Sequence, residues 1–163
     1  MPPSNTIVPI FSGDDPRVAE ARMLLLEYTD SLGVDLSFQN VDRELSEFPG
    51  RYMPPGGALL LASHGGKLAG SVAMRKLEAE ACEMKRLYVR PDVRGLGVGR
   101  ALAVAVIQAA RDCGYRKMRL DTLAGMDDAQ GLYEALGFRE IAAYYENPVP
   151  GTRYMELDLR SLK

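Results

Sequence analysis

Residues 83–101 read EMKRLYVRPDVRGLGVGRA, and the rest of the chain can be interpreted outward from this segment. Its beginning, 83–89, has the length and apolar content of a strand, and a helical pattern begins at Val98 after a glycine-rich turn. The first turn of a helix presents unpaired N–H groups and the positive end of the helix dipole, and glycines let an anion approach that backbone closely. Arg94 and Arg100 add positive charge on both sides. The segment therefore predicts a strand, a turn and a helix that together bind a pyrophosphate.

Other interpretations of these glycines have to be weighed. A nucleotide-binding P-loop requires Gly-Lys-Ser/Thr after the glycines, whereas here Gly99 is followed by Arg100. A dinucleotide-binding fold expects GxGxxG in its first βαβ unit, and this chain has GxGxG after two hairpin strands. Asp121 does stand where such a fold could place a ribose-binding acid. A glycine-rich turn without any ligand is the remaining alternative.

Apolar and alternating runs predict the strands of a sheet. The turn His64-Gly65-Gly66-Lys67 joins two of them, so the strands from Ala58 to Val89 are expected to form an antiparallel meander. The expected strands lie at residues 6–11, 58–63, 68–76, 82–89, 117–123, 138–145 and 152–159.

Periodic apolar positions and end signals predict helices between these strands. The first helix follows Asp14-Asp15-Pro16, with an acidic N-cap and Pro at the first helical position, and ends at Gly33. We expect further helices at 41–48, from Val98 to Gly114 with Val98, Leu102, Ala105 and Ala109 on one face, and from Asp127 or Asp128 to Leu136-Gly137. The sequence therefore predicts one α/β domain over residues 1–163, with a mixed, mostly antiparallel sheet and helices on both faces.

Bulk properties exclude several classes of protein. The net charge of −2 provides no basic field for nucleic acid or an anionic membrane, and no segment approaches a membrane span or a signal peptide. Cys82 and Cys113 fit neither a disulfide framework nor a metal-binding pattern, and we expect both to be buried thiols in a reducing compartment. We therefore expect a cytoplasmic protein without a metal, nucleic-acid or membrane partner.

Two motifs resemble the GNAT superfamily of acetyl-CoA-dependent N-acetyltransferases. Arg94-x-x-Gly97-x-Gly99 matches the family's (Q/R)xxGx(G/A) acyl-CoA signature, and LYEALGF at 132–138 is similar to its LYxxxGF motif. The two motifs occur in the family's order, with a helix and a strand between them. The resemblance implies a GNAT-like fold and acetyl-CoA as co-substrate, without a metal.

The resemblance also implies where the co-substrate binds. Backbone amides of the loop and helix start would hold the pyrophosphate, and the edge of strand 82–89 would pair with the pantetheine arm. The thioester would lie in a gap between this strand and strand 117–123. Met126 departs from the family, in which many members carry Asn near the cofactor. The implied cofactor-binding residues are Leu87, Tyr88, Val89, Arg94, Gly95, Leu96, Gly97, Val98, Gly99, Arg100, Ala101, Ala129 and Tyr133.

Acyl transfer to an amine requires a base and a route for the thiolate to leave. An alkyl amine with a pKa of ~10.4 is mostly protonated at pH 7, so a carboxylate or a desolvating pocket must help. The resemblance implies Glu83 as base through a water, with Asp121 as second candidate, and backbone amides near 87–89 as donors to the carbonyl oxygen. Tyr133 would act on the CoA sulfur as general acid. The structural alternatives are a Glu83 paired with a cation and a Tyr133 that is only a core aromatic.

No shared motif identifies the acceptor. We expect YYENPVPGTR at 144–153, with Tyr28, Phe38 and Tyr52, to line its pocket, and we expect Lys85-Arg86 to be a charge pair on the strand surface. The predicted activity is N-acetylation of a primary amine of a small molecule or amino acid. A protein or peptide N-acetyltransferase and a non-catalytic acyl-CoA sensor are the alternatives. The resemblance also implies a homodimer through residues 138–159.

Overall fold

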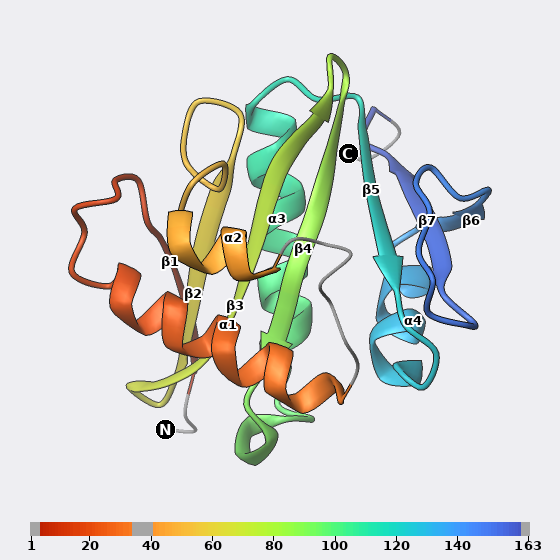
Figure 1. The fold of residues 1–163 in the computed structure, drawn as a ribbon. Coiled ribbons are helices and arrows are strands. Elements are labelled where there is room, and N and C mark those ends of the chain that lie inside the picture. The colour runs from red at the N-terminus through yellow and green to blue at the C-terminus, as the bar shows by residue number, and fades with distance from the viewer. Residues whose placement is uncertain (1–3, 34–40, 161–163) are drawn as a thin grey trace.

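The computed structural model describes residues 4–33 and 41–160, and in this part of the chain the strands form one sheet (Figure 1). The sheet order is β1-β2-β3-β4-β5-β7-β6, and every neighbouring pair is antiparallel except β4 and β5. This arrangement confirms the mixed, mostly antiparallel sheet. The strands are β1 (Asn5–Pro9), β2 (Ala58–His64), β3 (Lys67–Glu78), β4 (Ala81–Val89), β5 (Lys117–Thr122), β6 (Arg139–Ile141) and β7 (Arg153–Asp158).

Strands β4 and β5 pair over only part of their length. Their parallel register runs from Ala81 opposite Lys117 to Glu83 opposite Arg119 and then stops. Beyond this point β4 continues against β3 as far as Val89, whereas β5 continues against β7 as far as Thr122. The two central strands therefore diverge toward their carboxyl ends, as Figure 1 shows between β4 and β5.

A bulge in β4 changes which side chains share a face of the sheet. The register with β3 passes from Ser71 opposite Tyr88 to Ala73 opposite Lys85, so Arg86 and Leu87 together oppose one residue. Arg86 has φ 61°, in the left-handed region that non-glycine residues rarely adopt. Because of the extra residue, Tyr88 packs in the same core as α1 residues, while Leu87 packs on the opposite side, against the core that contains α3.

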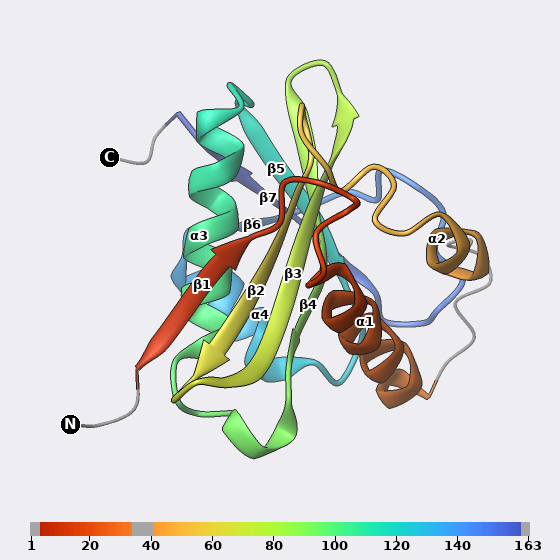
Figure 2. The same cartoon turned by 90° about the vertical axis from the view of Figure 1, so that its left-hand side faces the viewer.

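Helices cover both faces of the sheet, as predicted (Figure 2). One face carries α1 (Val18–Leu32) and α2 (Val41–Glu47), and the other carries α3 (Val98–Asp112) and α4 (Asp127–Ala135). Short 3-10 helix η2 (Pro91–Val93) connects β4 to the loop before α3. The buried face of α3 differs in part from the predicted one, because it consists of Val98, Leu102, Ala103, Val106, Ile107 and Ala110. No helix among the described residues combines the length and apolar character needed to cross a membrane.

The ends of several elements correct the sequence-based prediction. Gly33 does end α1 with φ 65°, but the helix begins at Val18, two residues after Pro16. The Asp15 carboxylate nevertheless accepts a hydrogen bond from the Arg17 amide, as an N-cap side chain does, and a second from the Arg17 guanidinium. The predicted strand at 138–145 is wrong beyond Ile141, where the chain leaves the sheet. Cys113 is exposed just after α3, whereas Cys82 is buried as expected.

Candidate active site

The loop between β4 and α3 is shaped by two glycines and held at two points. Gly95 and Gly97 have φ of 80° and 82°, and Gly97 is the N-cap of α3 without a side-chain cap. The Arg94 Nε donates to the Val89 carbonyl at 3.0 Å, and the Asn5 Nδ2 donates to the Leu96 carbonyl at 3.0 Å. The first amides of α3 are thus presented at the mouth of a cleft, where an anion can accept their hydrogen bonds.

This cleft, of about 820 Å³, runs from the loop along the edge of β4 to the start of α4. Its volume is within the range of small-molecule and cofactor sites, ~300–1,000 Å³. Among the predicted cofactor residues, Leu96, Ala101 and Tyr133 are not part of its lining; Leu96 is 49% exposed, Ala101 faces a neighbouring shallow groove, and Tyr133 lines the inner pocket described below. The predicted residues that do line it are Leu87, Tyr88, Val89, Arg94, Gly95, Gly97, Val98, Gly99, Arg100 and Ala129.

The lining fits a diphosphate attached to an extended arm. Helix amides and two arginines, Arg94 and Arg100, gather at one end, and the unpaired edge of β4 at 87–89 follows toward the centre of the sheet. Met126, which stands at the N-cap of α4, contributes an apolar side chain where an amide was expected by resemblance. Acetyl-CoA has this combination of a pyrophosphate and an extended, hydrogen-bonding arm.

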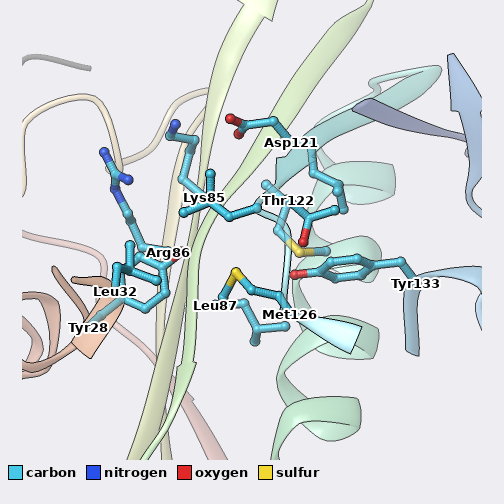
Figure 3. Close-up of a pocket in the computed structure, with 12 residues that line it drawn as sticks. Tyr28, Leu32, Lys85, Arg86, Leu87, Asp121, Thr122, Met126 and Tyr133 are labelled. Carbon is cyan, nitrogen blue, oxygen red and sulfur yellow. The ribbon is translucent and has the colours of Figure 1, made fainter. Parts of the chain in front are cut away.

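An inner pocket continues the cleft into the gap between β4 and β5 (Figure 3). The two share lining residues, among them Tyr28, Leu87 and Met126. The inner pocket adds polar side chains from both diverging strands and from α4: Lys85 and Arg86 of β4, Asp121 and Thr122 of β5, and Tyr133. The divergence of the strands therefore brings predicted catalytic residues Asp121 and Tyr133 to one continuous site.

Tyr133 projects from α4 into this pocket, with its hydroxyl directed toward Leu87 and Met126 in Figure 3. Its ring is 7% exposed and packs edge-to-face on Phe138, with ring centroids 5.7 Å apart. Burial raises the pKa of the Tyr133 hydroxyl above its ordinary value, so the group stays protonated near neutral pH. Tyr133 can therefore donate a hydrogen bond to an atom that gains negative charge.

Glu83 is placed differently from Asp121. Its side chain is 1% exposed and does not line the inner pocket or the cleft. The Arg75 guanidinium lies 3.0 Å from Oε1, and the Tyr144 hydroxyl donates to Oε2 at 2.6 Å. The observed contacts are those of the structural alternative, a strand carboxylate paired with a cation.

Asp121 lines the pocket, and both hydrogen bonds to its carboxylate come from the segment after β6. Oδ2 accepts hydrogen bonds from the Tyr145 hydroxyl and from the Asn147 Nδ2 at 3.1 Å. Burial and the hydrogen bond to Asp121 raise the pKa of Tyr145, so it remains a donor. Asp121 is thus oriented by two side chains from the segment after β6 and is accessible from the pocket.

The predicted surface pair Lys85-Arg86 is wrong, because both side chains are buried. Arg86 Nη2 and Nε contact the two carboxylate oxygens of Glu44 at 2.9 and 3.2 Å. Burial opposes the charge of Glu44, but the hydrogen bonds from Arg86 outweigh it and hold its pKa below the ordinary value. Lys85 is 5% exposed and lines the inner pocket. No residue preference in the sequence indicates the bulge at Arg86, so the burial of these two side chains could not be predicted.

The segment predicted to form the acceptor pocket lies beside the site, in part as expected. Tyr144, Tyr145 and Asn147 bind the two candidate carboxylates, which is the physical reason that this segment leaves the sheet. Tyr28 lines the pocket, whereas Tyr52 is in the core and packs edge-to-face on Phe48. Arg153 is directed away, to Glu134 and Glu140. Phe38 lies outside the described residues.

Comparisons with known proteins agree with this geometry. The profile of the Acetyltransferase (GNAT) family matches residues 23–138. An uncharacterised N-acetyltransferase of Schizosaccharomyces pombe is 45% identical over 141 residues, which cover 85% of this chain and 86% of that protein. N-acetylaspartate synthetase of Rattus norvegicus is 33% identical over 135 residues; these cover 80% of this chain but only 45% of the relative, so the chain spans less than half of it.

Solved structures show the same fold. A GNAT-family acetyltransferase from Staphylococcus aureus has a TM-score of 0.76 at 21% identity, covering 96% of this chain and 99% of that one. Salmonella typhimurium yncA, solved with its cofactor acetyl-CoA, has a TM-score of 0.66 at 20% identity, covering 94% of each chain. With a family profile over most of its length and a relative at 45% identity, the chain belongs to the GNAT family and is an acyl-CoA-dependent N-acetyltransferase.

Proposed function

We propose that the protein transfers the acetyl group of acetyl-CoA to the primary amine of a small molecule or amino acid, with only the reacting end of the acceptor at the inner pocket, whose volume is about 30 Å³. The observation that carries this proposal is the continuity of the cleft with a pocket that holds both Asp121 and Tyr133. The donor is supported by yncA, whose structure contains acetyl-CoA, and the acceptor class by the relative named N-acetylaspartate synthetase.

Acetyl-CoA supplies an acetyl group that is activated as a thioester. The amides at the start of α3, with Arg94 and Arg100, bind its pyrophosphate, and the edge of β4 at 87–89 pairs with its pantetheine arm. Backbone amides of the same edge donate hydrogen bonds to the carbonyl oxygen, where negative charge develops. The bulge at Arg86 reorients this part of β4 and exposes it to the pocket.

Asp121 accepts the proton of the incoming amine, through a water molecule. We assign this role to Asp121 in preference to Glu83, because Asp121 lines the pocket and Glu83 is enclosed by Arg75 and Tyr144. Tyr133 donates a hydrogen bond to the departing sulfur. A tyrosine with a pKa of at least ~10 does not protonate a thiolate of pKa ~8.5 downhill, so its contribution is mainly stabilisation of the developing anion.

Release of the CoA thiol, measured across amines, amino acids, polyamines and short peptides, tests the proposal. We expect acceptor-dependent release with one class of small amine. Tyr133→Phe serves as the control for chemistry, since it removes one hydroxyl and keeps the ring packed on Phe138. Release with peptides alone would show a protein or peptide acceptor, and binding of acetyl-CoA without any acceptor-dependent release would contradict the enzymatic role.

A further inference from the structure

Lys85 is a buried cation that the proposed chemistry does not use. Its side chain comes from β4, is 5% exposed, and reaches the same end of the inner pocket as Asp121 in Figure 3. Within 4–33 and 41–160 its ammonium makes no hydrogen bond or ion pair. An ammonium has three donors, and no described protein atom accepts from this one, so its donors are available to a group that enters the pocket.

The neighbouring charges are already paired with each other. Arg75 binds Glu83, and Arg86 binds Glu44 through both carboxylate oxygens. Asp121 lies across the pocket and accepts its hydrogen bonds from Tyr145 and Asn147. Lys85 is thus the pocket-lining cation without an ion pair, among the residues that the structure describes.

Burial has a direct effect on Lys85. It lowers the pKa of the ammonium below its ordinary value, and the nearby positive charge of Arg86 adds to this, while Glu83 and Asp121 oppose it. An uncompensated buried charge destabilises the free protein, and an anionic ligand removes that penalty. The missing partner of Lys85 is therefore an anion that enters the pocket with the acceptor.

We propose that the acceptor is an amine that also carries a carboxylate, that is an amino acid, and that Lys85 binds this carboxylate. The inference rests on the proposed function and names the substrate class for the same pocket. An amino acid carries one group for each of these side chains, because its amine can approach Asp121 while its carboxylate approaches Lys85. The inner pocket, about 30 Å³, has room for this end of the acceptor, and the rest of the molecule must lie outside it. Polyamines lack the anionic group and would place a second cation against Lys85.

This assignment makes Lys85 a residue that determines specificity. It contacts the part of the acceptor that does not react, so its removal should weaken binding of one substrate class and leave the chemistry intact. A base or a purely structural lysine would act on all acceptors alike. Comparison of an amino acid with its own amide separates these roles, because the amide has nearly the same size and lacks the negative charge; binding is compared at a pH at which both amines are protonated.

The experiment measures binding by calorimetry, in the presence of saturating CoA, for a series of amino acids and their amides. Wild type is expected to prefer the best-bound acid to its amide by about 30-fold or more, and Lys85→Met to lower its affinity by a similar factor. Affinity for the amide should change by less than about threefold, within the effect of an uncharged contact. Lys85→Arg, which keeps the charge, should restore part of the preference. Lys67→Met, in the exposed hairpin, is the matched control.

Outcomes of this experiment separate the two proposals. Equal binding of acid and amide to wild type would overturn the role of Lys85, as would an equal loss of both in Lys85→Met. Thermal melting establishes that each variant is folded. Because binding is measured with CoA and no acetyl transfer, a preference for acids that depends on Lys85 supports this inference even if transfer is absent, in which case the proposed function alone fails.

Discussion

Replacement of Glu83 by glutamine should lower the stability of the protein, whereas replacement of Asp121 by asparagine should lower kcat. Glu83→Gln removes a charge that Arg75 contacts at 3.0 Å and that Tyr144 contacts at 2.6 Å. Charge-assisted hydrogen bonds contribute ~1.5–3 kcal/mol each. The Arg75 side chain is 30% exposed, so water solvates the guanidinium after its partner is lost and reduces the destabilisation. We therefore expect the free energy of unfolding to fall by about 2–3 kcal/mol, with kcat changed by less than about threefold.

Asp121→Asn should show the reverse pattern. The asparagine oxygen still accepts hydrogen bonds from Tyr145 and Asn147, so unfolding should become easier by only about 1 kcal/mol. Loss of the base should lower kcat by about 10²-fold or more.

Thermal melting and initial rates of thiol release measure both effects. For a chain of this size, 1 kcal/mol corresponds to about 2–4 °C in Tm, so Glu83→Gln should lower Tm by about 5–10 °C. Glu80→Gln, at a surface pair 3.6 Å from Arg116, is the matched control and should change neither property. A Glu83→Gln variant with unchanged Tm and a hundredfold lower kcat, beside an active Asp121→Asn, would refute our assignment of the base.

Four further substitutions test other parts of the site. Tyr133→Phe should lower kcat by ~10²-fold with little change in the Kd for CoA, and an unaltered rate would remove the hydroxyl from the mechanism. Gly97→Ala should weaken CoA binding in a titration. An alanine at φ 82° strains the backbone by ~1–2 kcal/mol, and relief of this strain shifts the first amides of α3; a variant with the affinity of wild type for CoA would contradict the role of these amides. Gly131→Ala should raise stability by ~1 kcal/mol, since no described atom lies within 4 Å of the added Cβ, and a lower Tm would contradict this. Lys85→Met should raise Tm at pH values below the depressed pKa of Lys85, where the ammonium of the folded wild type is charged without a partner. The gain should shrink as pH rises from that pKa toward ~10.4, and a gain independent of pH would contradict the assignment.

The loop before α3 and the start of that helix could be predicted from the sequence, because glycine has a physical requirement there. Gly95 and Gly97 adopt positive φ, and the helix that follows them begins where the apolar pattern does. The meander of β2, β3 and β4 followed from the tight turn at 64–67, whereas the gap between β4 and β5 was expected from the family resemblance. These features depend on local preferences and on connection lengths, which a single sequence displays.

The acceptor side was predicted less well, because it depends on one extra residue in β4. Strict alternation would not place Lys85 and Tyr88 on one face, and arginine at φ 61° gives no sequence signal. The tyrosines after Ile141 have the composition of a strand, and their hydrogen bonds to the carboxylates of Glu83 and Asp121 explain why they leave the sheet. These hydrogen bonds join residues that are distant in the sequence, so no local pattern predicts them.

Acetyl transfer to an amine is tested most directly by identification of the product by mass spectrometry, with acetyl-CoA labelled in its acetyl group. We expect one labelled acetyl group on the amine nitrogen of the acceptor for each CoA thiol released, and we expect Tyr133→Phe to slow both together. Thiol release with the label found only in free acetate, or no label on any amine although acetyl-CoA binds, would contradict it.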